Sequence, residues 1–337
     1  MTWPTTLRTW LLSFTLVLAH PTIALAGEDW EQFKTAYISN GRVVDVGQNG
    51  ISHTEGQGMA LLLAVQNNDP AAFSQIWNWT QANLQVRDDK LFAWSWSPKV
   101  GVNDMNNASD GDLFIAWALS RAYSQWNEPR YLFAGIQVSQ SIRNKLLRKT
   151  SKGTVLLPGA VGFEKEDALK LNLSYWVFPA IKELSILDPS PEWEDLRVTG
   201  LQLIQESRFG KWHLPPDWIS LQNNVISAVD GDRFGYDAVR IPLYLIWGQE
   251  ATPSSINPFQ SFWGSFNGKG LLPAWVNLDT GEIATYNASI GFRSIADLTL
   301  AYPNVDSTQL PSFNPSEGYY SSMLYLFTKL ALEDLKK

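Results

Sequence analysis

The chain has 337 residues, with 26 basic and 33 acidic side chains and a formal net charge of −7. This acidic balance argues against a nucleic-acid partner or an anionic lipid surface, because both attract basic proteins. The absence of cysteine excludes disulfides and thiolate metal sites, and three histidines are too few for a histidine-rich metal centre, so we expect no metal and no cofactor.

The first 26 residues have the pattern of a secretory signal peptide. Arg8 precedes the apolar run Trp10–Ala19, which is too short to span a bilayer, and Ala24-Leu25-Ala26 is a small-x-small cleavage site. Cleavage before Gly27 would leave residues 27–337 as one domain with a net charge of −8, because Arg8 is the only charged residue removed. We therefore expect an exported protein, periplasmic or secreted, with no membrane span after cleavage. A retained membrane anchor is the alternative.

Apolar residues recur at helical spacing through most of the remaining chain. The periodicity predicts helices over 56–67, 70–84, 110–126, 129–149, 166–187, 191–207, 237–247, 254–264, 290–300 and 317–333. Strand-like alternation is scarce, and Thr154–Leu157 is one candidate. Clusters of Gly, Pro and Asn separate the helices and read as turns. So many helices with connections of moderate length indicate an all-α fold of paired helices, either a closed double ring or an open αα-solenoid.

Two of the predicted helices begin with cap-like sequences. Thr54 and Gln57 have the spacing of a capping box, and Ser109 and Asp112 have the same spacing. A cap of this kind would satisfy the free N–H groups of the first helical turn. We therefore expect these side chains to cap their own helices.

Three acidic residues lie at or near predicted helix starts: Glu55, Asp110 and Asp237. In a ring of paired helices such starts can face one end of the barrel. Acids also occur in first turns simply because they complement the helix dipole, so each one could be a capping residue. The chain contains 16 tryptophans, whose flat faces can stack on sugar rings. Carboxylates from distant segments together with many tryptophans favour hydrolysis of a sugar polymer, which needs an acid and a base or nucleophile.

Several short motifs, taken in order, resemble those of glycoside hydrolase family 8. They are Ser52-His53-Thr54-Glu55-Gly56-Gln57, Phe92-Ala93-Trp94-Ser95-Trp96, Ala108-Ser109-Asp110-Gly111-Asp112, Leu157-Pro158-Gly159, Leu173-Ser174-Tyr175, Pro216-Asp217-Trp218 and Tyr236-Asp237-Ala238-Val239-Arg240. The resemblance covers most of residues 27–337 and is greatest to the endoglucanases encoded with bacterial cellulose synthase. It implies an (α/α)6 barrel that acts as an inverting endo-β-1,4-glucanase, either degrading cellulose-like glucan or trimming chains during synthesis.

The resemblance also implies roles for individual residues. Glu55 matches the general acid and Asp237 the general base, while Asp110 matches an aspartate that holds the distorted sugar. Tyr175 and Arg240 match positions near the same subsite, and Trp94 and Trp96 match aromatic platforms, for which core packing is the alternative. A β-1,4-glucan is the implied substrate, the cellulose synthase machinery is a candidate partner, and we expect a monomer.

The chain departs from the family pattern close to Glu55. Thr54 replaces a serine, and Met59 and Ala60 replace a tyrosine and a glycine, which leaves the details of the subsite open. His53 is interpreted as a solvated loop residue, with a cleft residue as the alternative. The family also acts on chitosan, xylan and mixed-linkage glucan, and these substrates stay open. So do two different classes of protein, a non-catalytic glucan-binding barrel and a scaffold that binds another exported protein.

Overall fold

Eleven α-helices make up about half of the described chain. The computed structural model describes residues 27–229 and 231–337, so the predicted signal peptide, residues 1–26, lies outside the described residues. The helices are α1 Glu28–Tyr37, α2 Thr54–Gln66, α3 Pro70–Asn83, α4 Ser109–Trp126, α5 Pro129–Leu146, α6 Phe178–Leu187, α7 Pro191–Glu206, α8 Arg240–Trp247, α9 Pro253–Gly264, α10 Ile290–Ala301 and α11 Tyr319–Asp334. None of these helices is long and apolar enough to cross a membrane.

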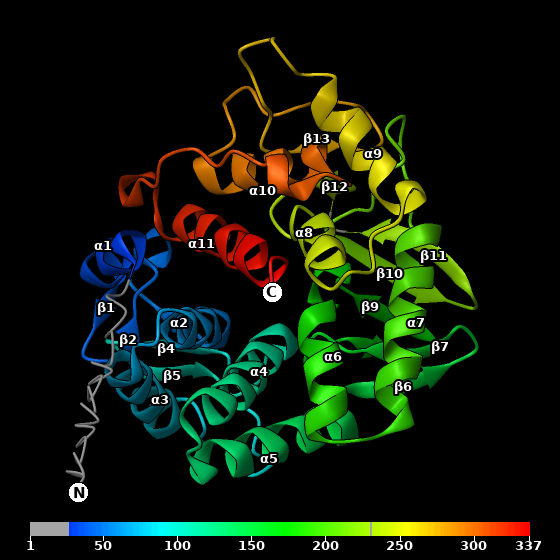
Figure 1. The fold of residues 1–337 in the computed structure, drawn as a ribbon. Coiled ribbons are helices and arrows are strands. Elements are labelled where there is room, and N and C mark those ends of the chain that lie inside the picture. Colours follow the sequence, from blue (N-terminus) through cyan, green and yellow to red (C-terminus); the bar gives the residue numbers. More distant parts are fainter. Residues whose placement is uncertain (1–26, 230) are drawn as a thin grey trace, which may run out of the picture.

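The helices form two concentric rings, as Figure 1 shows. The inner ring contains α2, α4, α6, α8, α10 and α11, and α11 packs on α2 to close it. The outer ring contains α1, α3, α5, α7 and α9 (Figure 1). Between α10 and α11, the sixth outer place is taken by a segment with two 3₁₀ turns, η3 Val305–Ser307 and η4 Pro315–Glu317. The predicted (α/α)6 barrel is confirmed, and the open solenoid is wrong.

The two rings differ in the way their helices are buried. All eight residues of α8 are buried, and α2 is buried from Gly56 to Val65. An outer helix such as α5 buries only one stripe at three- and four-residue spacing, including Tyr131, Val138 and Ile142. Helices that are apolar all round are driven to the interior, whereas amphipathic ones cover them.

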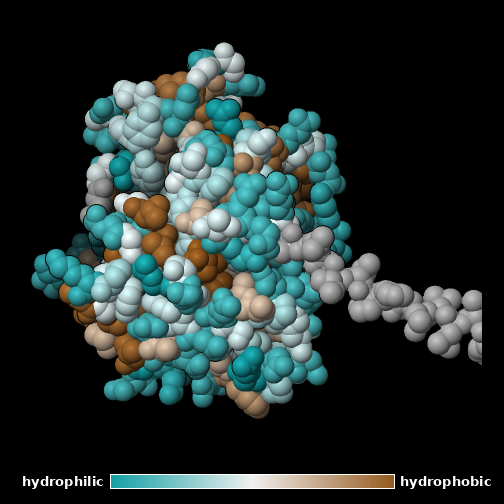
Figure 2. All heavy atoms as spheres, turned by 90° about the vertical axis from the view of Figure 1, so that its left-hand side faces the viewer, coloured by the Kyte–Doolittle hydropathy of each residue, from teal (hydrophilic) through white to brown (hydrophobic). Residues whose placement is uncertain are grey.

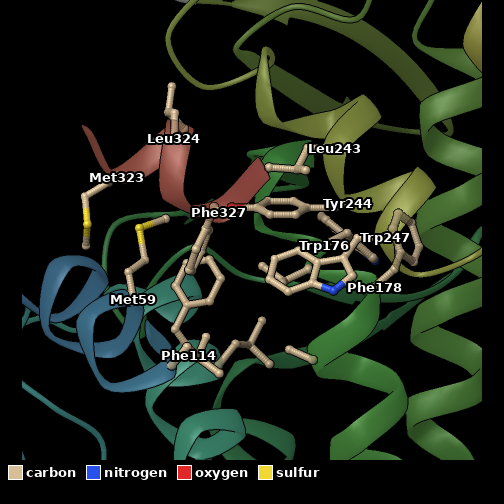
Figure 3. Close-up of a cluster of buried hydrophobic side chains, with 14 of the residues drawn as sticks. Met59, Phe114, Trp176, Phe178, Leu243, Tyr244, Trp247, Met323, Leu324 and Phe327 are labelled. Atoms are coloured by element: carbon tan, nitrogen blue, oxygen red, sulfur yellow. The ribbon is translucent and has the colours of Figure 1, made fainter. Parts of the chain in front are cut away.

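The barrel axis is filled with large side chains from the inner helices (Figure 3). Phe327 of α11 packs against Phe114 of α4 at 5.3 Å and against Trp247 of α8 at 5.5 Å between ring centroids. Met59, which replaces the family's tyrosine, is 1% exposed and lies in this cluster. Its substitution therefore alters core packing. The face in Figure 2 is hydrophilic over most of its area, with apolar residues gathered in smaller patches.

Short strands connect the helices and were largely missed by the sequence analysis. One sheet has the order β11-β10-β9-β8, a second the order β3-β4-β5, and three further sheets pair β1 with β2, β6 with β7, and β12 with β13. The strands are β1 Ile38–Ser39, β2 Arg42–Val43, β3 Ser52–His53, β4 Ser95–Ser97, β5 Gly101–Asp104, β6 Leu147–Thr150, β7 Gly153–Leu156, β8 Glu164–Lys165, β9 Ala168–Leu171, β10 Trp218–Gln222, β11 Val225–Val229, β12 Arg233–Phe234 and β13 Val276–Asn277.

Two predicted helices are corrected by these strands. The helix predicted over 166–187 begins only at Phe178, because Ala168–Leu171 pairs with β10 in the four-stranded sheet. The helix predicted over 129–149 ends at Leu146, because the next residues pair with β7. Strand β7 itself confirms the predicted strand near Thr154, and α1 was not predicted. Strand pairing overrides the local helical pattern in both places, through a distant strand for 168–171 and through a hairpin for 147–150.

The first turns of α2 and α4 pack directly on one another. A Cβ atom at Gly58 would lie 2.6 Å from Cβ of Phe114, and one at Gly111 would overlap Oγ1 of Thr54. Only glycine allows this approach of the two backbones. The contact therefore places Glu55 and Asp110, which neighbour Thr54 and Gly111, at the same end of the barrel.

Candidate active site

The start of α2 is capped by His53. His53 Nδ1 accepts the N–H of Gly56 at 3.1 Å, whereas the predicted capping box of Thr54 and Gln57 is wrong. Gln57 points into the core, where its Oε1 accepts the N–H of Val43 at 2.6 Å. Because neighbouring groups satisfy the first turn, the side chain of Glu55 is left free to reach the cleft, and it is 22% exposed.

The start of α4 carries two buried acids with different partners. Asp110 is 2% exposed, and its Oδ2 lies 3.5 Å from Nη1 of Arg240. Asp112 accepts the N–H of Phe92 at 3.1 Å and the side-chain amide of Asn107 at 2.7 Å. The predicted cap between Ser109 and Asp112 is therefore wrong, and Asp112 instead holds the loop before α4.

Asp237 lies in a turn rather than in a helix. The helix predicted from residue 237 begins at Arg240, so Asp237 comes three residues before α8 and after β12. The side chain of Asp237 is 29% exposed. Its position at the entry to an inner helix places it at the same barrel end as Glu55.

Arg240 joins all three predicted acids. Its Nη1 donates to Oε1 of Glu55 and lies 3.5 Å from Asp110, while its Nη2 donates to Asp237 at 2.8 Å and to Oγ of Ser174 at 2.9 Å. Arg240 is 2% exposed. A buried guanidinium needs carboxylate partners, and buried carboxylates need a cation, so the four groups stabilise one another. Residues from α2, α4, α8 and the turn before α8 thus meet in one cluster.

The cluster changes the proton affinity of its acids. Burial raises the pKa of Asp110 well above its usual range, and the charge of Glu55 raises it further, against the opposing effect of Arg240. Burial also raises the pKa of Asp237, while Arg240 opposes that rise. A carboxylate with a raised pKa binds a proton more readily, as a general base must.

Tyr175 and two residues beside it complete this side of the cluster. The ring centroid of Tyr175 lies 5.9 Å from Cζ of Arg240, and burial raises the pKa of its hydroxyl far above its usual range. Ser174 was not among the predicted site residues. It accepts a hydrogen bond from Arg240, and its own hydroxyl donates to Oδ1 of Asn172 at 2.7 Å. Ser174 lies inside the Leu173-Ser174-Tyr175 motif, so the motif was a usable signal for it.

Trp94 and Trp96 lie beside the start of α2 and differ from each other in their surroundings. Trp94 is partly exposed, its Nε1 donates to Asp104 at 3.0 Å, and its carbonyl accepts the N–H of Thr54. Trp96 packs edge-on against Trp79 at 5.3 Å and is partly buried against the core. These surroundings favour the platform interpretation for Trp94 and the core interpretation for Trp96.

A cavity of about 540 Å³ opens beside Glu55, Asp237 and Arg240. Its walls include Tyr236, Phe292 and Tyr320, and also the pair of His53 and Asp45. His53 is 9% exposed, and its Nε2 lies 3.5 Å from Oδ2 of Asp45, so the interpretation as a solvated loop residue is wrong. Aromatic faces combined with a few polar groups suit a carbohydrate ligand.

In the described part of the chain, no group of three or more His, Cys, Asp and Glu side chains has the arrangement of a metal site. The charged partner of Glu55, Asp110 and Asp237 is instead Arg240. The arrangement places two partly exposed carboxyl groups, those of Glu55 and Asp237, on one buried guanidinium next to an open cavity.

Comparisons with known proteins agree with this geometry. A probable endoglucanase of Novacetimonas hansenii is 39% identical over 329 residues, which cover 95% of each chain. An endoglucanase of Cellulomonas uda is 37% identical over 286 residues, covering 83% of this chain and 79% of that one. The solved structure of an endo-beta-1,4-glucanase from Acetobacter xylinum is 37% identical, has a TM-score of 0.88, and covers 94% of this chain and 100% of its own.

The sequence profile described as Glycosyl hydrolases family 8 matches residues 3–334, which is nearly the whole chain. The fold, the order of the motifs and the convergence of the acids on Arg240 agree with that match. The chain is a glycoside hydrolase and belongs to glycosyl hydrolases family 8.

Proposed function

We propose that this protein is an inverting endo-β-1,4-glucanase that hydrolyses internal bonds of cellulose-like glucan. The observation that carries the proposal is the pair of Glu55 and Asp237 on one guanidinium, next to an open cavity. The endoglucanase relatives from Novacetimonas and Cellulomonas, and the endo-beta-1,4-glucanase from Acetobacter, support the choice of glucan.

In the proposed reaction, Glu55 gives its proton to the glycosidic oxygen while Asp237 takes a proton from a water molecule. The water oxygen bonds to the anomeric carbon as the bond to the leaving sugar breaks, so the configuration inverts. Glu55 ends the step as a carboxylate and Asp237 ends it protonated, and exchange with solvent restores both. The raised pKa of Asp237 favours its part as the base.

The neighbouring groups hold these two residues and the sugar in place. Arg240 donates to both carboxylates, which fixes their directions, and its charge offsets theirs. Asp110 adds a buried carboxyl against the same guanidinium, where it can accept hydroxyl groups of the distorted sugar ring. Tyr175 lies over Arg240 and closes this side of the subsite.

Stereochemistry of the products tests the proposal. Proton NMR during hydrolysis of a cello-oligosaccharide should show the α-anomer first, and Asp237→Asn should lose turnover by about 10²–10⁴-fold, the range for a lost acid or base. First appearance of the β-anomer, or near-normal turnover of Asp237→Asn, would contradict it. Parallel digests of chitosan, xylan and mixed-linkage glucan should be slower. No hydrolysis of any glycan, with intact glucan binding, would identify a non-catalytic barrel.

The site of action is also part of the proposal. Residues 1–26 have the sequence pattern of a signal peptide, so the protein would meet glucan in the periplasm or outside the cell, with the cellulose synthase machinery as a candidate partner. Mass measurement of protein from periplasmic and medium fractions should find a chain beginning at Gly27. A chain that keeps residues 1–26 in the membrane fraction would contradict export by cleavage.

A further inference from the structure

Below the turn that carries Asp237 lies a carboxylate that no step of the proposed reaction uses. Asp217 follows a pair of prolines and immediately precedes β10, and it is 7% exposed. Its main-chain N–H donates to the carbonyl of Arg233 at 2.6 Å, which joins it to β12. The side chain of Asp217 therefore lies directly beneath residues 235–239, the link between β12 and α8.

One oxygen of Asp217 accepts three main-chain N–H groups from this link. Oδ1 receives the N–H of Gly235 at 3.0 Å, of Asp237 at 3.0 Å and of Ala238 at 2.9 Å. Hydrogen bonds to an ionised acceptor are roughly twice as strong as neutral ones. Without Asp217, the donors of Gly235 and Ala238 would be buried and unsatisfied, which is costly.

The second oxygen of Asp217 and the shape of the loop fit the same arrangement. Oδ2 accepts from Nε of Arg233 at 3.3 Å. A Cβ atom at Gly235 would lie 3.1 Å from Oδ2 of Asp217 and 3.0 Å from Nε of Arg233, so a side chain there would crowd both groups. Gly235 allows the backbone to come close enough for its N–H to reach Asp217.

We propose that Asp217 is a positioning residue for Asp237, acting through the main chain of the turn that carries it. The proposal rests on the proposed function of Asp237 as the base. The Asp217 carboxylate accepts the N–H groups of Gly235, Asp237 and Ala238 and so fixes the main chain of the turn. The fixed main chain sets the direction in which the side chain of Asp237 points at the attacking water. A side chain in a turn has no helix to hold it, so a fixed anchor beneath the turn replaces that support.

The charge of Asp217 has a second effect on the same residue. Burial raises the pKa of Asp237, Arg240 lowers it, and the negative charge of Asp217 raises it. The titratable and charged groups that face Asp237 from the surrounding elements are Arg240 on α8, Glu55 on α2, Asp110 on α4, Tyr175 on η2 (Leu173–Tyr175), Tyr320 on α11 and Asp217 before β10. Loss of the Asp217 charge therefore lowers the pKa of Asp237.

The variant Asp217→Asn tests the proposal, because loss of the charge weakens the three N–H bonds that hold the turn. Hydrolysis of a soluble cello-oligosaccharide should fall by about 10²-fold, the loss expected when a catalytic group is misplaced by an ångström. The acidic limb of the kcat/KM profile should move to lower pH, because that limb follows deprotonation of the base. A purely structural role would lower Tm and leave this limb in place, and that result would overturn the proposal.

Two further variants separate the possible failures. Asp69→Asn is the matched control, since Asp69 also accepts a main-chain N–H, that of Ala72 at 3.0 Å, but at the opposite end of α2 from Glu55. It should lower Tm without moving the acidic limb. Asp237→Asn separates this proposal from the proposed function: if Asp237→Asn is inactive while Asp217→Asn behaves as wild type, only the positioning role fails. An active Asp237→Asn would overturn the assignment of the base itself.

Arg233→Gln gives a second measurement in case Asp217→Asn does not fold. The Arg233 side chain is 43% exposed, and its loss leaves the three N–H bonds to Oδ1 in place, so kcat should change by less than that of Asp217→Asn. A loss of kcat of about 10²-fold in Arg233→Gln, which keeps those three bonds, would show that they do not decide the position of Asp237 and would overturn the proposal.

Discussion

Glu55 and Asp110 lie in the first turns of two inner helices that pack backbone against backbone, whereas Asp237 lies in a turn held from beneath by a side chain. The helix pair is stabilised by its own hydrogen bonds and by close packing at Gly58 and Gly111. In the turn, three N–H groups converge on one carboxylate, that of Asp217. The comparison teaches that the two members of the proposed catalytic pair rest on two kinds of support, so substitutions near Glu55 and near Asp237 should have different effects.

Glu55→Gln should have the largest effect on activity. The amide keeps the size of the side chain but supplies no proton, so turnover should fall by about 10²–10⁴-fold or more. Cello-oligosaccharide affinity, measured by calorimetry, should be largely retained because the cavity walls are unchanged. Glu31→Gln, an exposed acid in the first turn of α1, is the control and should be fully active. Near-normal turnover of Glu55→Gln would assign the acid to another residue.

Asp112, in the first turn of α4, should make the free energy of unfolding depend on pH. Burial raises the pKa of Asp112 to about 7 from an ordinary value of 3.8, so the folded state holds this proton over a range where the unfolded chain has released it. The contribution of protonated Asp112 to the free energy of unfolding should therefore fall by up to about 4 kcal/mol as pH rises from about 4 to 7.

Asp112→Asn should remove that dependence. The new side-chain N–H₂ would face the N–H₂ of Asn107, so two hydrogen-bond donors would meet. The variant should therefore be less stable than wild type at pH 4, and the difference in stability should shrink toward pH 8. Urea unfolding across this range measures both chains. Parallel stability curves for the two would contradict the prediction.

Asp110→Asn, a change in the first turn of α4, should lower activity and leave stability nearly unchanged. As a residue that holds the sugar, Asp110 should be needed for turnover, and we expect a loss of roughly 10²-fold. No cap depends on it, because its Oδ1 accepts only the N–H of its neighbour Gly111, so Tm should change little. Wild-type turnover would show that Asp110 serves only to stabilise the charge cluster around Arg240.

Gly111→Ala should break the contact between the two helices directly. The added methyl group would overlap Thr54 and would force α4 away from α2. We expect this displacement to lower the free energy of unfolding by about 1–3 kcal/mol. Turnover should fall as well, because Glu55 and Asp110 would separate. Gly162→Ala is the comparison: a Cβ atom there has no atom within 4 Å, so any loss of stability would come from the positive φ and not from overlap. A stable and fully active Gly111→Ala would show that the close packing is not needed.

The two tryptophans should give the smallest effects and sharpen the difference between cleft and core. Trp94→Ala should weaken binding of long glucans while stability stays within about 0.5 kcal/mol. Trp96→Ala should lose about 1–2 kcal/mol through its contacts with Trp79 and the Arg42 guanidinium, without weakening binding. A melting curve and a binding isotherm for each variant measure both quantities. The reverse pattern would exchange the two roles.

Much of this protein can be read from its sequence because the informative patterns are local. Inner helices such as α2 and α8 are apolar nearly all round, so their positions follow from the composition of the segment itself. The motifs around Glu55, Asp110 and Asp237 also lie in short segments. For these reasons the barrel, the family and the candidate acids were predictable, and Arg240 was predicted by its place in the last motif.

Tertiary structure alone decided how these local pieces are held. The predicted caps failed because Gln57 and Asp112 found partners in other segments, and the helix predicted from residue 166 gave way to a strand that pairs with β10. Likewise, nothing local to Asp217 indicates that its carboxylate meets a turn some twenty residues later. A buried polar group takes whichever partner satisfies it, and that partner is known only when distant segments have been brought together.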